Sequence, residues 1–448
     1  MGCRKRNQRN VCRFLEMAVY ESGWIQNKIE KRDWNIMKAE KGLNILARML
    51  LILFVISATI LPVLTTDSNQ PELDGYYSKF ILHNAIAVIF MVIVLLRALF
   101  RRKFKKNFII GVCLLTLAFI AYNVLYYQNM DVIQFPWTQY NTSISLGLLI
   151  VLMVTETKTI FWDDRLIKMI IVIILITNMI GLYVYYQGYI SMHMYNLKLY
   201  LHPFDLNVYG ERRFNWIYFY KCQYSCILLL FVGFFVTHKD KFWNKLLYIL
   251  GLAVLFWCLY VAHTNTSTIC AAMVVVADCI DEVLKDKKFF VAKVIGLIVV
   301  AIGVIKYGFK YFLNWLSGER NLSTMGTRIP IWKTAVQKIR ETPKGVGNNF
   351  ALNRDYWLWK DGVFYTNNCH NIFLNEMYRF SIPVGCSYAA FFLLTCVYSL
   401  FKKFSFCRLA IWVAFFVAVS MDYSIQTPEL SMVMFMFYCI FFYPLEEE

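Results

Sequence analysis

The residues best suited to chemistry lie in one polar stretch near the C-terminal end of a mostly apolar chain. Arg328 follows Gly326 and Thr327, and His370 and Asn371 come later in the same stretch. A guanidinium group can hold a phosphate through paired hydrogen bonds, and a neutral imidazole can accept a proton from a hydroxyl group. These side chains predict a site that binds a phosphorylated, lipid-linked substrate and removes a proton during the reaction.

A short helix is expected to begin next to Arg328. Pro330 suits the first turn of a helix. The apolar residues after it recur at helical spacing and are Trp332, Ala335, Val336 and Ile339. We expect this amphipathic helix to lie on the membrane face, with Arg328 at its N-terminus, where free amides and the helix dipole favour an anion.

A glycine turn and a second helix are expected to follow. Pro343, Gly345 and Gly347 predict a turn whose backbone can approach another chain or a ligand closely, so both glycines are candidate substrate contacts. Asn371 is a favoured N-cap and also a candidate substrate contact. His370 would stand just before that helix, where the dipole disfavours the imidazolium and leaves a neutral imidazole that can accept a proton.

The rest of the chain is suited to a membrane. Its 448 residues are 59% hydrophobic and 17% aromatic, with a mean hydropathy of +0.49. Apolar runs long enough to cross roughly 30 Å of hydrocarbon begin near Ile45 and predict about twelve spans. The predicted spans are residues 45–64, 80–100, 107–127, 141–157, 166–187, 214–237, 245–262, 266–284, 289–309, 383–401, 408–425 and 428–444.

Lysine and arginine set the predicted orientation. They are concentrated in residues 1–43 and in every second connector, namely 101–106, 158–168, 239–245, 285–288 and 402–403. These segments should face the cytoplasm, so both termini should be cytoplasmic. The net charge of +17 then reflects contact with anionic lipid. The sequence has no basic stripe interleaved with aromatic residues, and we therefore expect no binding of nucleic acid.

The expected fold class is all-α, a polytopic membrane protein with one long extracytoplasmic loop. Its predicted parts are a basic cytoplasmic segment (1–43), the first nine spans (44–309), an extracytoplasmic catalytic loop with short helices (310–382), and the last three spans with a short tail (383–448). Of the 13 cysteines, Cys369 lies on an external loop without an outer partner, so no disulfide framework is expected. No His and Cys cluster has the spacing of metal ligands, so no metal is expected.

One ordered set of residues resembles a known family. Gly-Thr-Arg, Trp, Ala, Pro-x-Gly-x-Gly, His-Asn-x-x-Leu, Glu and Pro-x-Gly follow one another along the chain. This order resembles the characteristic loop of the O-antigen polymerase and O-antigen ligase superfamily. The matching positions are 326–328, Trp332, Ala335, 343–347, 370–374, Glu376 and 383–385.

The resemblance implies an all-helical, GT-C-like glycosyltransferase in the bacterial cytoplasmic membrane. Its donor would be a polyprenyl-diphosphate-linked glycan, and its acceptor a glycan or a lipid. Transfer would be metal-independent and inverting, without a cofactor, and a chain-length regulator and a flippase are implied as partners. Arg328 would hold the diphosphate, and His370 would be the general base.

The chain departs from the family pattern at one place. Family members carry a further arginine near the end of the preceding span, where residues 266–268 read Thr-Ser-Thr. A second phosphate ligand would then come from Arg212 or Arg213, between which the sequence does not distinguish. Lys221 should lie about two turns into the predicted span 214–237, and an ionisable residue within an apolar helix is a functional candidate.

These assignments have structural alternatives. Arg328 and Lys221 could be snorkelling side chains, and His370 a structural histidine at the membrane boundary. A second His-Asn pair, His83 and Asn84, stands near the outer end of the span 80–100 without an accompanying arginine helix. We expect this second pair to be structural.

Three functions stay open on these residues. A polymerase and a ligase share the donor and differ in the acceptor. We favour the polymerase, because a bias towards Lys, Ile, Asn and Tyr is typical of low-GC bacteria that make capsule or wall polysaccharide. A transporter or flippase for lipid-linked glycan is the alternative from another class, but the sequence lacks the internal repeats and paired broken spans typical of such folds.

Overall fold

Helices dominate the structure, a computed structural model. It describes residues 37–65, 71–101, 104–105, 108–128, 137–161, 163–195, 198–203, 213–218, 221–285, 290–303, 328–346, 369–421 and 427–446. Five helices in these ranges are long and apolar enough to cross a membrane. They are Met37–Thr59, Lys79–Arg101 within α2 (Pro71–Arg101), α3 (Ile109–Tyr127), α6 (Arg165–Tyr186) and α14 (Ile382–Lys402). The predicted membrane character is thereby confirmed.

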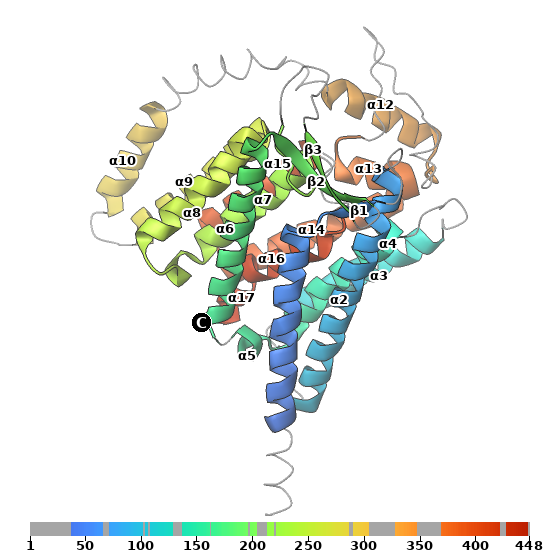
Figure 1. Ribbon diagram of the computed structural model, residues 1–448, viewed down its shortest axis with the longest axis horizontal. Coiled ribbons are helices and arrows are strands. Elements are labelled where there is room, and N and C mark those ends of the chain that lie inside the picture. Colours follow the sequence, from blue (N-terminus) through green and yellow to red (C-terminus); the bar gives the residue numbers. More distant parts are fainter. Residues whose placement is uncertain are drawn as a thin grey trace, which may run out of the picture.

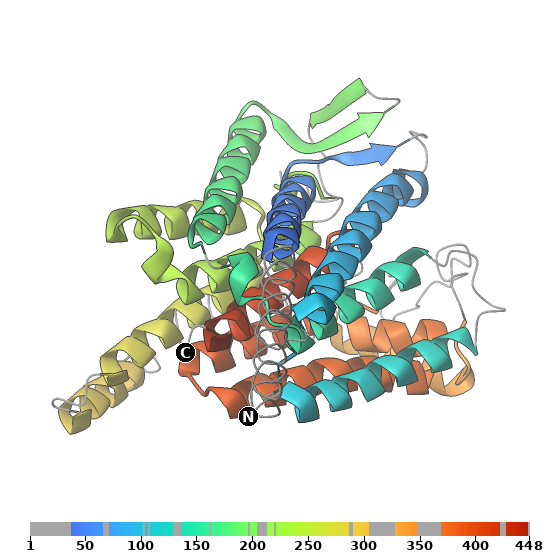
Figure 2. The same ribbon diagram turned by 90° about the horizontal axis from the view of Figure 1, so that it is seen from below.

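Each of the other predicted spans also contains a helix. These helices are α4 (Trp137–Val154), α7 (Lys221–Thr237), α8 (Lys245–Val261), α9 (Asn265–Lys285), α10 (Phe290–Gly303), α15 (Phe406–Met421) and α16 (Leu430–Phe441). Single turns form α5 (Lys158–Phe161), η3 (Lys239–Lys241) and α17 (Tyr443–Glu446). Residues 304–309 and 422–425 of two predicted spans lie outside the described residues, as do residues 1–36. Figure 2 shows α10 extending away from the other helices.

The predicted all-helical fold has one exception among the described residues. Three strands form a small sheet in the order β1 (Val63–Thr65), β2 (Tyr189–Tyr195) and β3 (Lys198–Pro203). β1 pairs with β2 in parallel, and β2 pairs with β3 antiparallel. Only two residues separate β2 from β3, a spacing that fits a β-hairpin. β1 overlaps the end of the predicted span 45–64, and β2 and β3 lie between the predicted spans 166–187 and 214–237.

A second difference concerns the predicted span 214–237. Its helix, α7, begins only at Lys221, and residues 213–218 run in an irregular buried path. Several hydrogen bonds fix this path, among them Trp216 Nε1 to the Thr59 carbonyl at 2.9 Å and the Tyr218 hydroxyl to the Ala58 carbonyl at 2.9 Å. Backbone groups that a continuous helix would have paired internally also find outside partners, since the Phe214 amide donates to the Val261 carbonyl at 3.1 Å and the Trp216 carbonyl accepts from the Met192 amide at 3.1 Å.

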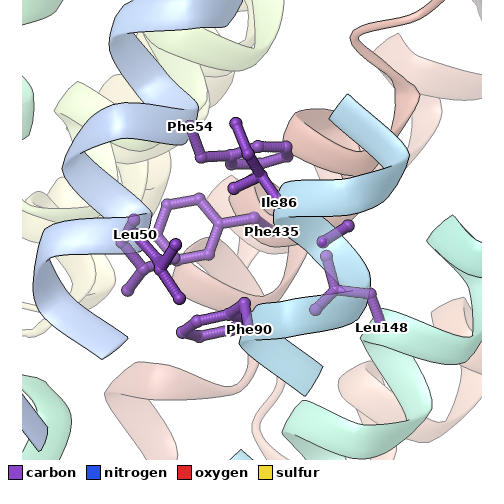
Figure 3. A pocket seen from close by; sticks show the side chains of 8 residues that line it. Leu50, Phe54, Ile86, Phe90, Leu148 and Phe435 are labelled. Atoms are coloured by element: carbon purple, nitrogen blue, oxygen red, sulfur yellow. The ribbon is translucent and has the colours of Figure 1, made fainter. Parts of the chain in front are cut away.

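The interior of the bundle is packed with aliphatic and aromatic side chains. Figure 3 shows a small pocket within this interior, lined by Phe435 of α16 and by side chains from three other helices. These side chains include Leu50 and Phe54 from Met37–Thr59, Ile86 and Phe90 from α2, and Leu148 from α4. Phe435 is fully buried. This close packing brings helices from both ends of the sequence together.

Ion pairs and hydrogen bonds connect the helices at the end of the bundle that contains α17 (Tyr443–Glu446). Arg101 pairs with Glu40, and Lys105 pairs with Glu446 of α17. Arg48 donates to the carbonyls of Thr159 and Ile160 at 3.0 and 2.5 Å. Figure 1 places α5 and α17 at this lower end, and places α12 (Arg328–Glu341), α13 (Ile372–Phe380) and the sheet at the opposite end.

α13 and α14 approach each other closely near that upper end. A Cβ atom added at Gly385 would lie 2.8 Å from the Met377 backbone nitrogen and 3.0 Å from its Cα. Backbone atoms cannot move aside as a side chain can. The crossing therefore requires a glycine at this position of α14.

We expect Gly385→Ala to lower the thermal stability of the purified protein, because overpacking at a close contact costs about 1–3 kcal/mol. Gly296→Ala is the matched control, since a Cβ at that position of α10 meets nothing within 4 Å. The control should be neutral or slightly stabilising. Equal melting temperatures for the two variants in the same detergent would show that the crossing tolerates a methyl group.

Candidate functional site

The helix predicted beside Arg328 is present, but its surroundings differ from the prediction. α12 begins at Arg328 and ends at Glu341. The apolar face was expected to meet the membrane, but most of it is covered by protein, with Val336 left exposed. It packs against α13 in a small separate core whose buried members are Ile331, Ala335, Ile339, Cys369 and Tyr378. The amphipathic pattern was real, but a protein surface covers the apolar face.

The predicted turn after α12 is confirmed at Gly345. This residue has a φ of +83°, and its amide donates to the Thr342 carbonyl at 2.9 Å. A Cβ at Gly345 would lie 2.5 Å from the carbonyl oxygen of Arg379. The next amide, from Val346, donates to the Tyr378 carbonyl at 3.0 Å. The close approach that we predicted is therefore made by the backbone of α13. Gly347 lies outside the described residues.

Asn371 is the N-cap of α13, as predicted. Its Oδ1 accepts hydrogen bonds from the amides of Phe373 at 3.0 Å and Leu374 at 3.1 Å. His370, directly before it, is half-buried and has a positive φ of 48°. The cap and the backbone conformation of His370 together fix the position of the Cα atom from which its side chain extends.

Arg328 and Asn371 meet the same structure, the C-terminal end of α15. Arg328 Nε donates to the Met421 carbonyl at 3.0 Å, and Asn371 Nδ2 donates to the Ser420 carbonyl at 3.4 Å. The last carbonyls of a helix have no partner within it and carry partial negative charge, so they favour a cation. The structure thus brings the two predicted parts of the site together at one helix end.

The contacts at the end of α15 place Arg328 near Asn371, the residue that follows His370. Arg328 is half-buried, and its Nε is the donor to the Met421 carbonyl. Cys369 beside His370 is fully buried in the small core between α12 and α13. Burial raises the pKa of its thiol well above the usual range, which disfavours a thiolate nucleophile.

A buried polar contact connects α13 to α3. Glu376 is 1% exposed, and its Oε2 lies 3.2 Å from the hydroxyl of Tyr122 on α3. The same hydroxyl donates to Gln139 Oε1 of α4 at 2.7 Å. Asn375 of α13 accepts from the Cys369 amide at 2.7 Å. Glu376 belongs to the ordered motif of the sequence, but its role as a brace depends on α3, which the motif does not include.

The remaining candidates lie elsewhere. Arg212 falls outside the described residues, and Arg213 is half-buried at the start of the irregular path 213–218. Lys221 was predicted to lie about two turns inside a span. It is instead the first residue of α7. Its Nζ donates to the His263 carbonyl at 2.7 Å. This bond gives Lys221 a structural role at the start of α7.

A buried charged cluster was missed by the sequence reasoning. Lys79 of α2 forms an ion pair with Glu429, the residue before α16, and both side chains are almost fully buried. The Lys79 ammonium also lies 5.6 Å from the ring centroid of Tyr218. His83, one turn along α2, is fully buried beside this pair, which agrees with its predicted structural role. The presence of Glu429 within a predicted apolar span was the signal that could have identified the cluster.

Comparisons with known proteins add no family assignment. A scan against protein-family models finds no match, and a search of curated proteins finds none. The resemblance to the O-antigen polymerase and ligase superfamily therefore stays a prediction from the motif.

We expect Asn371→Ala to destabilise the protein by about 1 kcal/mol, the usual effect of losing an N-cap. Asn371→Asp keeps an oxygen that can accept from the same two amides, and should stay close to the wild-type stability. Thermal unfolding of the two purified variants tests the cap. A similar loss in both would place the stabilisation in the bond to Ser420 instead.

The buried ion pair allows a double-mutant test. Lys79→Met leaves the Glu429 carboxylate buried without its cation and should cost about 3–5 kcal/mol of stability, whereas the double variant Lys79→Met/Glu429→Leu should recover most of that loss. Melting temperatures and yields of folded protein provide the measurement. Additive effects of the single substitutions would contradict a direct interaction between the two side chains.

Proposed function

We propose that this chain is a membrane glycosyltransferase that polymerises polyprenyl-diphosphate-linked oligosaccharide repeats into a surface polysaccharide. The ordered motif supports the proposal. The observation that carries it is that Arg328 and Asn371, the residue after His370, both donate to the last carbonyls of α15. Transfer to a terminal acceptor, the ligase reaction, would use the same residues with a different acceptor.

The mechanism follows from the chemistry of the donor. The bond between the anomeric carbon and the diphosphate oxygen breaks, and negative charge grows on the leaving polyprenyl diphosphate. Arg328 would stabilise this charge, with Arg213 or Arg212 as the second cation. His370 would take the proton of the acceptor hydroxyl as its oxygen forms the new bond to the anomeric carbon. Attack from the face opposite the diphosphate gives inversion.

The proposal includes a topology. The shorter apolar helices α4, α7, α8, α15 and α16, with α9 and α10, would complete a bundle of about twelve helices in a bacterial cytoplasmic membrane. α12 and α13 would lie on the outer face, and both termini in the cytoplasm. This assignment is supported by the basic connectors and by the separation of α12 and α13 from α5 and α17 in Figure 1.

We expect His370→Ala to slow glycan transfer by about a hundredfold to ten-thousandfold, the usual cost of losing a general base. Arg328→Ala should slow it by about a hundredfold to a thousandfold, because it removes a charge that stabilises the leaving group. His263→Ala and Arg340→Ala are matched controls, since both side chains are exposed and Arg340 lies on the same helix. The measurement is the size distribution of lipid-linked glycan in cells at matched expression.

The size distribution, seen as a ladder of bands when the glycans are separated on a gel, distinguishes the candidate functions. Collapse of the ladder to a single lipid-linked repeat in both site variants supports the polymerase. Long lipid-linked chains that fail to reach their final acceptor indicate the ligase. An unchanged ladder in well-expressed His370→Ala and Arg328→Ala proteins refutes the assigned site and favours the transporter.

A further inference from the structure

An apolar groove runs between α9 and α15, away from α12 and α13. It has a volume of about 710 Å³, and every residue that lines it apart from Thr268 is apolar. Ala272, Met273 and Val276 line it from α9, and Leu409 and Val413 from α15. These side chains are exposed in the structure. The size falls within the range of sites that hold one extended organic molecule, roughly 300–1,000 Å³.

Positive charge is concentrated beyond one end of this groove. Phe406, the first residue of α15, lines that end, and Lys403 and Arg408 flank it in sequence. Arg408 donates to the Lys403 carbonyl at 3.5 Å. Burial lowers the pKa of the Lys403 ammonium, and the neighbouring cations Arg408 and Lys285 lower it further. Lys403 therefore lies close enough to Arg408 and Lys285 to be repelled by both, and an anion beside Lys403 would be stabilised.

The nearby carboxylates of α9 have other contacts. Asp281 accepts from the amides of Phe406 at 3.0 Å and Cys407 at 2.7 Å, and so caps the N-terminus of α15. Asp278 and Glu282 form ion pairs with Lys239, each at 2.9 Å. These contacts direct the carboxylates towards the helix terminus and η3.

We propose that the groove between α9 and α15 binds an acyl chain of an anionic phospholipid whose phosphate lies against Lys285 and Lys403, with Arg408 behind them. An apolar channel that leads to a cluster of cations is complementary to an amphiphile with a negative headgroup. Basic pockets between transmembrane helices on the cytoplasmic side bind such headgroups. The proposed lipid site does not depend on the glycan chemistry of the opposite end.

Native mass spectrometry of the full-length protein in detergent tests this site, with phosphatidylglycerol and phosphatidylcholine as the added lipids. Wild-type protein should bind phosphatidylglycerol more tightly. Lys285→Gln/Lys403→Gln should weaken that binding roughly tenfold or more, as expected for two lost lysine contacts. Lys41→Gln/Lys158→Gln is the matched control, because it makes the same charge change at exposed lysines elsewhere and should have no effect.

The apolar part of the site is tested by filling the groove. Ala272→Phe places a ring in it from an exposed position, and Val276→Trp does so from a second one. Each should weaken binding of both lipids, with wild-type thermal stability. Equal affinity of wild-type protein for the two lipids, an equal loss in the two double-lysine variants, or unchanged binding in both groove variants would overturn the proposal.

Discussion

The partial negative charge at the end of α15 is the constraint on which the candidate site depends. α12 and α13 are separated by a long stretch of sequence, and each has a polar side chain that donates to a carbonyl in the last turn of α15. Such carbonyls need partners, and an arginine and an asparagine are suitable donors. One electrostatic feature of the backbone thus sets the relative positions of the two residue groups to which the chemistry is assigned.

Three further contacts make this placement precise. The Gly345 turn lies against the backbone of α13, which fixes the end of α12 relative to that helix. Glu376 and Tyr122 join α13 to α3, and Gly385 lets α14 cross α13 closely. A catalytic group needs such support because small displacements from the reacting atoms strongly reduce the rate. The short helices near the site are therefore attached to the bundle by contacts on several sides.

Local rules predicted the local structure well. The start of α12, the Asn371 cap and the Gly345 turn follow from residue types and spacing within a few positions, and all three are present. Long-range packing was not predictable in the same way. The contact of the apolar face of α12 with α13, the irregular path 213–218, the small sheet and the ion pair of Lys79 with Glu429 each depend on a partner distant in sequence. Hydrophobic periodicity indicates that one face of a helix is buried, but it does not identify the element that packs against that face.

The two ends of α15 are held by side chains from other helices. Asp281 of α9 accepts from its first amides, and Arg328 and Asn371 donate to its last carbonyls, about 24 Å away along the axis for a helix of 16 residues. Opposite charges thus compensate the dipole at both termini. α15 consequently acts as a stiff strut between opposite ends of the bundle. A displacement of its Asp281 end along the helix axis would reach the Arg328 end almost undiminished.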